Sequence, residues 1–259
     1  MNAQARRRAL ALFPFLVLLF SGCAGTGDHG RSYESTGTFP VASEIQPNVD
    51  FWRQVYGVWS RSQVAFHDDE YMGVIYEVAD LPGYTGRGYS SDQRHYIAAK
   101  EAWYAGRLKS VEQKVRRGNS LSRDERALHD KLVDAGGKSA IYGASERVRA
   151  QRGIREKFRR GLEISGRYDE TFREIFRSRG LPEDLAYLPH VESSFQVNAR
   201  SGVGAAGIWQ FMPATGRIYG MTVSHAVDDR LDPVVAAEGA ASYLGSAHAK
   251  LKSWPLAIT

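Results

Sequence analysis

The sequence of 259 residues contains a single cysteine, Cys23. One cysteine cannot build an internal disulfide framework, so the class of small disulfide-stapled domains is excluded. The sequence also lacks a His, Cys and Asp cluster with metal-ligand spacing, and it lacks a glycine-rich loop of the phosphate-binding kind. It therefore predicts neither a bound metal nor a cofactor.

A strong excess of positive charge is lacking as well. The formal net charge is +5, but Arg6, Arg7 and Arg8 supply three of those charges from residues 1–22, which contain no acids, and this leaves +2. A second basic stretch follows Ser145, and it is compatible either with a polyanion-binding face or with a solvated helix face. We favour the solvated face and expect no nucleic-acid partner.

The only long apolar run lies at the amino terminus. It extends from Ala9 to Phe20 after the three arginines, which is too short for a comfortable membrane span and typical of a cleaved signal peptide. Ser21-Gly22-Cys23 resembles a bacterial lipobox, in which the cysteine is lipidated, and Ala24 resembles lipoproteins sent to the outer membrane. We expect a lipid anchor at Cys23 and a location at the periplasmic face of the outer membrane. The alternative is an ordinary secretory signal.

Composition and periodicity divide the chain into four regions. Residues 1–22 are the signal peptide, and residues 23–48, rich in Gly, Ser, Thr and Pro, indicate a flexible tether. Residues 49–164 are predicted as a helical amino-terminal region, and residues 165–259 as a second helical domain. The fold class is therefore mainly α, with at most a few short strands.

Apolar spacing places the helices of residues 49–164. One helix is predicted through Phe51, Val55, Trp59, Gln63 and Phe66, a second through Ile97 to Val115, a third after the capping-box pair Ser122 and Glu125, and a fourth from Ser145 through Leu162. Residues 71–78 fit either a strand or a buried helical turn.

Glu192 stands out in the second domain. Leu181, Leu185 and Leu188 recur at helical spacing, and Glu192 occupies the next position of that stripe, with Pro189 expected to kink or restart the helix. A carboxyl at the end of an apolar stripe is partly desolvated, and desolvation raises its pKa. Such a group can hold a proton near neutral pH and donate it.

An ordered set of motifs surrounds this glutamate. It comprises Glu192-Ser193-Ser194-Phe195, Ala199-Arg200-Ser201 and the run from Gly204 through Gly207-Ile208-Trp209-Gln210-Phe211-Met212-Pro213 to Thr215. This set resembles the lytic transglycosylase family, and its flank Leu181 to Ser194 looks most like the membrane-bound lytic murein transglycosylase D type. The resemblance is close over about residues 145–259 and looser over 50–140.

The resemblance implies a lysozyme-like fold (the goose-type lysozyme or SLT kind), with residues 165–259 as the catalytic domain. It implies cleavage of the β-1,4 bond between N-acetylmuramic acid and N-acetylglucosamine in peptidoglycan, with a 1,6-anhydromuramyl product. Glu192 matches the family's catalytic acid, while Ser193, Ser201, Gln210 and Met212 match positions that line its substrate cleft.

Two alternatives remain open. A muramidase would use water and leave a reducing end, and a non-catalytic lipoprotein would bind peptidoglycan without cutting it. The family's third motif, Ala-Tyr-Asn, would follow directly after Thr259, so we expect a carboxy-terminally truncated sequence with weak activity or none.

Overall fold

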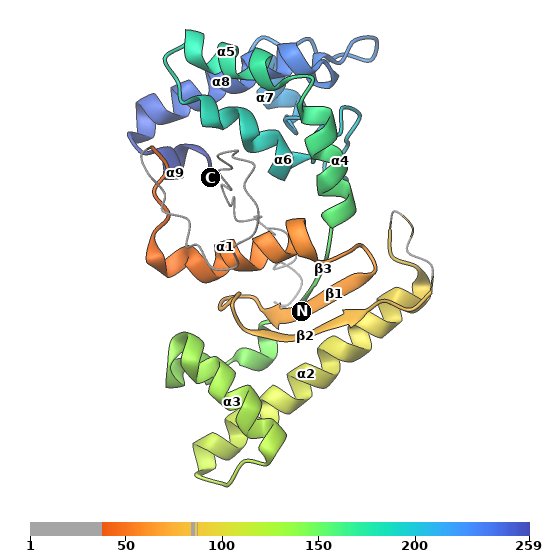
Figure 1. Cartoon of the computed structure of the whole chain (residues 1–259), viewed down its shortest axis with the longest axis vertical. Coiled ribbons are helices and arrows are strands. Elements are labelled where there is room, and N and C mark those ends of the chain that lie inside the picture. Colours follow the sequence, from red (N-terminus) through yellow and green to blue (C-terminus); the bar gives the residue numbers. More distant parts are fainter. Residues whose placement is uncertain (1–37, 84–85, 87) are drawn as a thin grey trace, which may run out of the picture. The chain divides into compact units, whose positions relative to one another are not determined.

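The computed structural model describes residues 38–83, 86 and 88–259. The described chain divides into two compact units, one formed by Val41–Arg160 and the other by Gly161–Thr259 together with residues 38–40 (Figure 1). The expected signal peptide, Cys23 and most of the expected tether lie outside the described residues. No helix in the described part of the chain is long and apolar enough to cross a membrane.

The unit Val41–Arg160 combines helices with one small sheet. Its elements are a 3-10 turn Ser43–Ile45, α1 (Gln46–Arg53), a π-helical turn Gln54–Val58, β1 (Gln63–Asp68), β2 (Ile75–Asp80), α2 (Ser91–Arg117), α3 (Arg123–Gly136), 3-10 turns Lys138–Ile141 and Ala144–Glu146, and β3 (Val148–Arg152). The antiparallel sheet has the order β2-β1-β3, with a register shift at Phe66/His67. Helix α4 (Arg155–Ser165) then runs from this unit into the next.

Two capping boxes begin the long helices of this unit. Ser90 accepts a hydrogen bond from Gln93 N, and Ser122 accepts one from Glu125 N, with the reciprocal side-chain bonds also present. Gly118 ends α2 in the left-handed conformation. The expected third helix and its capping box are thereby confirmed. The inner face of α2 packs with the sheet and α3 in one core, whose largest members include Phe66, Tyr104, Leu108, Val111 and Leu132.

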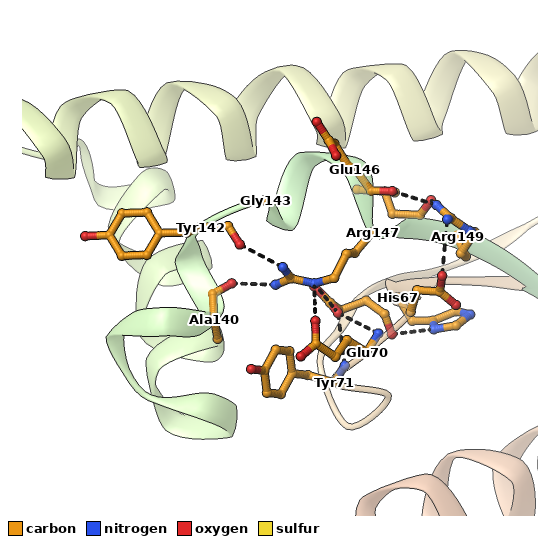
Figure 2. Close-up of polar contacts among 12 residues, drawn as sticks. His67, Glu70, Tyr71, Ala140, Tyr142, Gly143, Glu146, Arg147 and Arg149 are labelled. Carbon is orange, nitrogen blue, oxygen red and sulfur yellow. Dashed lines mark hydrogen bonds and ion pairs between the residues drawn. The ribbon is translucent and has the colours of Figure 1, made fainter. Parts of the chain in front are cut away.

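A buried ion pair ties distant parts of this unit together (Figure 2). Asp68 is fully buried at the end of β1, and its carboxylate accepts hydrogen bonds from Arg147 Nε at 3.0 and 3.1 Å. Asp68 also accepts hydrogen bonds from the Tyr76 hydroxyl and from the amides of Glu70 and Tyr71. The Arg147 guanidinium donates onward to two backbone carbonyls of residues 140–142, so both charges are fully hydrogen-bonded, as buried charges require.

The helix predicted through Phe51 to Phe66 is wrong in its second half. Helix α1 and the π-helical turn end at Val58, and Gln63–Asp68 is the central strand of the sheet. Every residue of β1 from Val64 onward is buried, because the strand has neighbours on both edges and cover on its faces. A strand buried in this way shows no two-residue alternation, so its apolar residues extended the helical pattern by coincidence.

The helix predicted from Ser145 is also wrong over its first part. Residues Val148–Arg152 form β3, and α4 begins only at Arg155. Gly153 separates the two elements, and a Cβ there would lie 2.3 Å from the Trp59 carbonyl oxygen. The basic residues therefore do not share one helix face. Arg149 pairs with Asp69, and Arg152 donates to the Arg61 carbonyl. These two arginines therefore bond residues that flank β1.

The second unit is helical. Its elements are α5 (Asp169–Ser178), a 3-10 turn Glu183–Tyr187, α6 (Leu188–Glu192), α7 (Pro213–Ile218), a 3-10 turn Asp229–Leu231, α8 (Pro233–Leu251) and α9 (Trp254–Ala257). Helices α5 and α8 pack together, with Phe172 and Phe176 of α5 in the same core as the alanines of α8. Small side chains on α8 allow this close approach.

Sequence signals place the ends of these helices correctly. Pro189 lies in the first turn of α6, which confirms the predicted restart, and Pro213 begins α7. Asp232 caps α8 by accepting hydrogen bonds from Val234 N and Val235 N at 2.9 and 3.0 Å. The tether was predicted to extend to residue 48, but its last part is structured. Phe39 is buried in this core, and α1 of the other unit begins at Gln46.

Candidate active site

Glu192 is the last residue of α6, and its side chain lines a pocket of about 260 Å³. The other lining residues come from four segments of the second unit: Leu188 of α6; Trp209, Gln210, Phe211, Met212 and Thr215 of the glycine-rich connection and α7; Ala240, Tyr243 and Leu244 of α8; and Ile258 and Thr259. No other side chain in this lining carries a formal charge. The pocket therefore offers one carboxyl group among apolar, hydroxyl and amide groups.

Burial raises the pKa of Glu192 to about 7. The cause is desolvation of the carboxylate, with no charged neighbour contributing to the shift. Near neutral pH, a large fraction of this carboxyl group therefore keeps its proton. A group with this pKa can donate a proton to a leaving oxygen and later accept one, which is the property required of a general acid and base.

The backbone turns sharply straight after Glu192. Ser194 and Phe195 both have φ of +54°, a conformation that is uncommon for residues with a side chain. The amides of Ser193 and Phe195 both donate to the Pro189 carbonyl at 3.1 Å, and the Phe195 ring is buried in the core. Buried contacts hold this strained turn in place, and it ends α6 so that Glu192 stays at the pocket.

Helix α4 approaches the same turn closely. At Gly161 a Cβ would lie 2.6 Å from the Ser194 carbonyl oxygen, so only glycine fits without a shift of the backbone. The position therefore couples the end of α4 to the turn that follows Glu192.

Ser193 is buried and faces away from the pocket lining. Its hydroxyl donates to the Ile208 carbonyl at 2.8 Å and lies 3.4 Å from the Pro189 carbonyl. The side chain thus joins the end of α6 to the glycine-rich connection. It does not hydrogen-bond the Glu192 carboxylate.

Ser201 likewise acts on the backbone. Its hydroxyl accepts a hydrogen bond from Ala205 N at 2.9 Å, and its amide donates to the Ala205 carbonyl. These bonds close the loop that contains Gly202 and Gly204. Ser201 is not among the residues that line the pocket.

Gln210 and Met212 do lie at the pocket. Gln210 has φ of +50°, and its Nε2 donates to the Gly207 carbonyl at 2.7 Å. Met212 precedes α7 and is 41% exposed, which is unusual for a large apolar side chain. The structure therefore brings together Glu192, Gln210 and Met212 of the predicted site residues, whereas Ser193 and Ser201 support the backbone around them.

Sequence reasoning missed Arg230, which braces the glycine-rich connection. The Arg230 guanidinium is buried, pairs with both oxygens of Asp228 at 2.8 and 2.9 Å, and donates to the carbonyls of Gly204 and Phe211. Its own carbonyl packs against Gly207, where a Cβ would lie 1.7 Å away. Asp228 thus holds the guanidinium of this arginine in place. No local sequence signal marks an arginine that bonds carbonyls 19 and 26 residues away.

Two aromatic residues near Glu192, Trp209 and His190, are buried. Trp209 packs on Phe172 and Phe176 at ring distances of 5.4 and 5.8 Å, while its edge also reaches the pocket. His190 is buried, with its ring 4.5 Å from that of Phe195, and burial lowers its pKa to about 4. His190 is therefore neutral at pH 7 and does not line the pocket.

Tyr243 is a second residue that the sequence did not indicate. It lines the pocket from α8 and packs edge-on against Tyr219 at 5.4 Å. Its position follows from the fold, which brings residues of α8 and α6 to the same pocket, and the spacing of residues on α8 alone does not reveal this. In the described part of the chain, no three His, Cys, Asp or Glu side chains are grouped so that they could hold a metal ion.

Part of the second unit resembles a known protein family. A family described as "Transglycosylase SLT domain" has a model that matches the chain from Phe172 to its last residue. Residues 172–259 match the SLT transglycosylase domain. The match covers about a third of the chain and contains Glu192, the glycine-rich connection and α8. The SLT domain is lysozyme-like, so the expected fold class, mainly α with a lysozyme-like domain, is confirmed.

Individual relatives match this chain over short stretches. The membrane-bound lytic murein transglycosylase D of Escherichia coli, in two strains, is 45% identical over 64 residues, which are 25% of this chain and 14% of the relative. A putative tributyltin chloride resistance protein of an Alteromonas species is 33% identical over 70 residues, which are 27% of this chain and 34% of the relative. The chain thus aligns with about a seventh of the length of the first relatives and a third of the other.

Proposed function

We propose that this protein is a peptidoglycan lytic transglycosylase. The observation that carries the proposal is Glu192, a single carboxyl in a pocket with a pKa of about 7, inside a match to the SLT transglycosylase domain. The 45% identity to lytic murein transglycosylase D supports the substrate, although it covers only a small part of that relative.

In the proposed reaction, protonated Glu192 gives its proton to the oxygen that links N-acetylmuramic acid to N-acetylglucosamine. The bond from C1 of N-acetylmuramic acid to that oxygen breaks. The 2-acetamido group of the N-acetylmuramic acid shares the positive charge that develops at C1. The C6 hydroxyl of the muramyl ring attacks C1, and Glu192, now a carboxylate, takes the hydroxyl proton. The product is a 1,6-anhydro sugar, no water is consumed, and Glu192 returns to its starting state.

One carboxyl group suffices for this scheme because the substrate supplies its own nucleophile. The common glycosidase plan requires two carboxyl groups about 5–9.5 Å apart. The side chains that line the pocket include only one, Glu192. This arrangement supports the substrate-assisted route over a two-carboxylate mechanism.

The remaining site residues have proposed roles that follow their positions. Gln210 and Met212 line the pocket and are proposed to contact the sugar rings. Ser193 and Ser201 are proposed to act on substrate binding indirectly, by holding the end of α6 and the glycine-rich connection in register. We further propose lipid anchoring through Cys23 at the periplasmic face of the outer membrane, which the signal-like amino terminus and the membrane-bound relative support.

Digestion of purified peptidoglycan sacculi, followed by mass spectrometry of the soluble products, tests the reaction. The protein should be produced at the length its gene encodes. The proposal predicts muropeptides that end in an anhydro sugar, lighter by one water than reducing-end products. Reducing ends alone would identify a hydrolytic muramidase instead. Binding to sacculi with no soluble product would identify a non-catalytic peptidoglycan-binding lipoprotein.

A further inference from the structure

An exposed tryptophan lies on α2, in the unit that does not contain Glu192. Trp103 is 51% exposed, although tryptophan is one of the largest apolar side chains. Its ring rests edge-on against Tyr104 at 4.7 Å. The Arg107 guanidinium lies 4.8 Å from the ring centre, and the Lys100 ammonium lies 5.9 Å from it. The ring is thus held in one orientation by neighbours on its own helix while half of its surface stays open.

A hollow of about 420 Å³ adjoins Trp103 between α2 and α3. Its lining is otherwise small or polar: Ala102, Gly106, Arg107 and Ser110 from α2, with Ser122 and Glu125 at the start of α3. The polar groups are fixed in place. Glu125 accepts hydrogen bonds from the Ser110 hydroxyl at 3.0 Å and from Lys114 at 2.7 Å. Figure 1 shows α3 returning beside the end of α2. Ser122 and Glu125 line the hollow from that side.

Gly106 is the residue that opens this hollow. It lies inside a helix of 27 residues, where glycine costs about 1 kcal/mol relative to alanine. A Cβ at Gly106 would meet no atom within 4 Å, and the residue has no positive φ. Neither packing nor backbone conformation therefore requires a glycine, and its main effect is to leave space one helical turn from Trp103.

The cation at this hollow lies over the Trp103 ring and makes one weak ion pair. Arg107 lies 3.4 Å from Asp124, whose own side chain is largely exposed, so the guanidinium is available for a second anion. A half-exposed indole ring, an adjacent cation and fixed hydroxyl and carboxylate groups together match a sugar ring that bears an acidic substituent. The apolar face of the ring stacks on the indole, and the acid pairs with arginine.

We propose that the hollow beside Trp103 is a second glycan-binding site, which holds N-acetylated, carboxylate-bearing sugars of the peptidoglycan strand away from the bond that is cut. This proposal rests on the proposed function for the identity of the glycan. The site retains the insoluble polymer and takes no part in bond cleavage.

The test compares binding to purified peptidoglycan sacculi by cosedimentation, in the full-length chain carrying Glu192→Gln so that the polymer stays intact. Trp103→Ala removes the stacking face, and Gly106→Leu fills the hollow without meeting any atom at its Cβ. Each should weaken binding by about fivefold or more. Tyr142→Ala is the matched control. Tyr142 is 41% exposed and the Arg116 guanidinium lies 4.5 Å from its ring centre, but Tyr142 does not line the hollow. It should bind like its parent.

A second readout separates this proposal from the proposed function. In the chain with Glu192 intact, Trp103→Ala should raise KM on sacculi and leave kcat unchanged. Gly106→Ala should not lower the melting temperature, because a Cβ at Gly106 meets no atom within 4 Å. Unchanged binding by Trp103→Ala and Gly106→Leu, or equal loss in the Tyr142→Ala control, overturns the second site even if cleavage is normal. If Trp103→Ala and Gly106→Leu lose binding to sacculi and the control does not, but the chain with Glu192 intact cleaves no peptidoglycan, the second site is retained and the proposed transglycosylase activity is rejected. A parent chain that does not bind sacculi rejects the site.

Discussion

The carboxyl group of Glu192 couples its chemistry to the stability of the domain that holds it. Its pKa is about 7 in the folded chain and near 4.5 when exposed, because burial penalises the charged form. The folded state therefore binds this proton more tightly than the unfolded state does. Stability from this group is present below about pH 4.5 and is lost as the pH rises through about 7.

Replacement of Glu192 by glutamine removes that pH dependence. A shift of this size corresponds to a difference of up to about 3 kcal/mol between acidic and alkaline conditions. We expect Glu192→Gln to unfold at a higher denaturant concentration than the parent at pH 8, with a much smaller difference at pH 4.5. Denaturant unfolding of both proteins at the two pH values measures this. Equal differences at both values would show that the folded carboxyl has an ordinary pKa.

The same proton controls activity if Glu192 is the general acid. The acid must be protonated in the free enzyme, so kcat/KM on peptidoglycan should fall as the pH rises through about 7. Initial rates between pH 5 and 9 give the profile, after a check that the protein stays folded over that range. An activity that rises steadily from pH 7 to 9 would contradict the role.

At the scale of single residues, part of the site could be predicted from the sequence and part could not. Glu192 was recognisable because an acid interrupted an apolar stripe, and Gln210 and Met212 because they stand in a matching motif. Arg230 and Tyr243 were missed because their roles depend on backbone atoms and helices distant in the sequence. The buried orientation of Ser193 was also beyond reach, since it depends on the path of the connection at Ile208.

Among the elements, the glycine-rich connection depends most strictly on residue size. Gly204 and Gly207 both have positive φ, at +95° and +79°, so either substitution by alanine strains the backbone. They differ in their surroundings. A Cβ at Gly204 meets nothing within 4 Å, whereas a Cβ at Gly207 would lie 1.7 Å from the Arg230 carbonyl oxygen.

We therefore predict that Gly207→Ala is far more damaging than Gly204→Ala. Gly204→Ala should cost about 1 kcal/mol of unfolding free energy, from backbone strain alone. Gly207→Ala should cost more than about 3 kcal/mol, because the Arg230 contact must move as well. Denaturant unfolding compares the two variants. Equal losses would show that Arg230 does not press on Gly207.

Helix ends were easier to predict from the sequence than strands. The capping box of Ser122 and Glu125 predicts the start of α3 from local chemistry, and the structure confirms it. Strands β1 and β3 were predicted as helix, because the pairing of β1 with β3 joins residues 80 to 88 positions apart. Local spacing carries no information about such a partner.

On the scale of the whole molecule, the buried pair of Asp68 and Arg147 links β1 to the segment before β3. Asp68 is fully buried, and its partner lies 79 residues away in the sequence. Neutralising Asp68 leaves the largely buried Arg147 with only the longer ion pair to Glu70 at 3.6 Å, and breaking a buried pair typically costs about 3–5 kcal/mol. The adjacent pair of Asp69 and Arg149 is half exposed on both sides and provides the contrast.

Asp68→Asn should accordingly lower the unfolding free energy of the Val41–Arg160 unit by about 3–5 kcal/mol, and Asp69→Asn by less than about 1 kcal/mol. Circular dichroism during urea unfolding reports both values. At temperatures where Asp68→Asn is still folded, its pH–rate profile should match that of the parent, because Glu192 lies in the other unit. Similar losses in the two variants would remove the special role assigned to the buried pair.

The most direct measurement of the central claim is the rate of anhydromuropeptide release from sacculi by the parent, by Glu192→Gln and by Glu163→Gln. Glu163 is an exposed acid of the same unit and provides the control for charge removal. We predict that Glu192→Gln loses about 10²–10⁴-fold in kcat while still binding sacculi, and that Glu163→Gln keeps the parent rate. A Glu192→Gln protein that releases anhydromuropeptides at the parent rate would contradict the assignment of Glu192 as the catalytic acid.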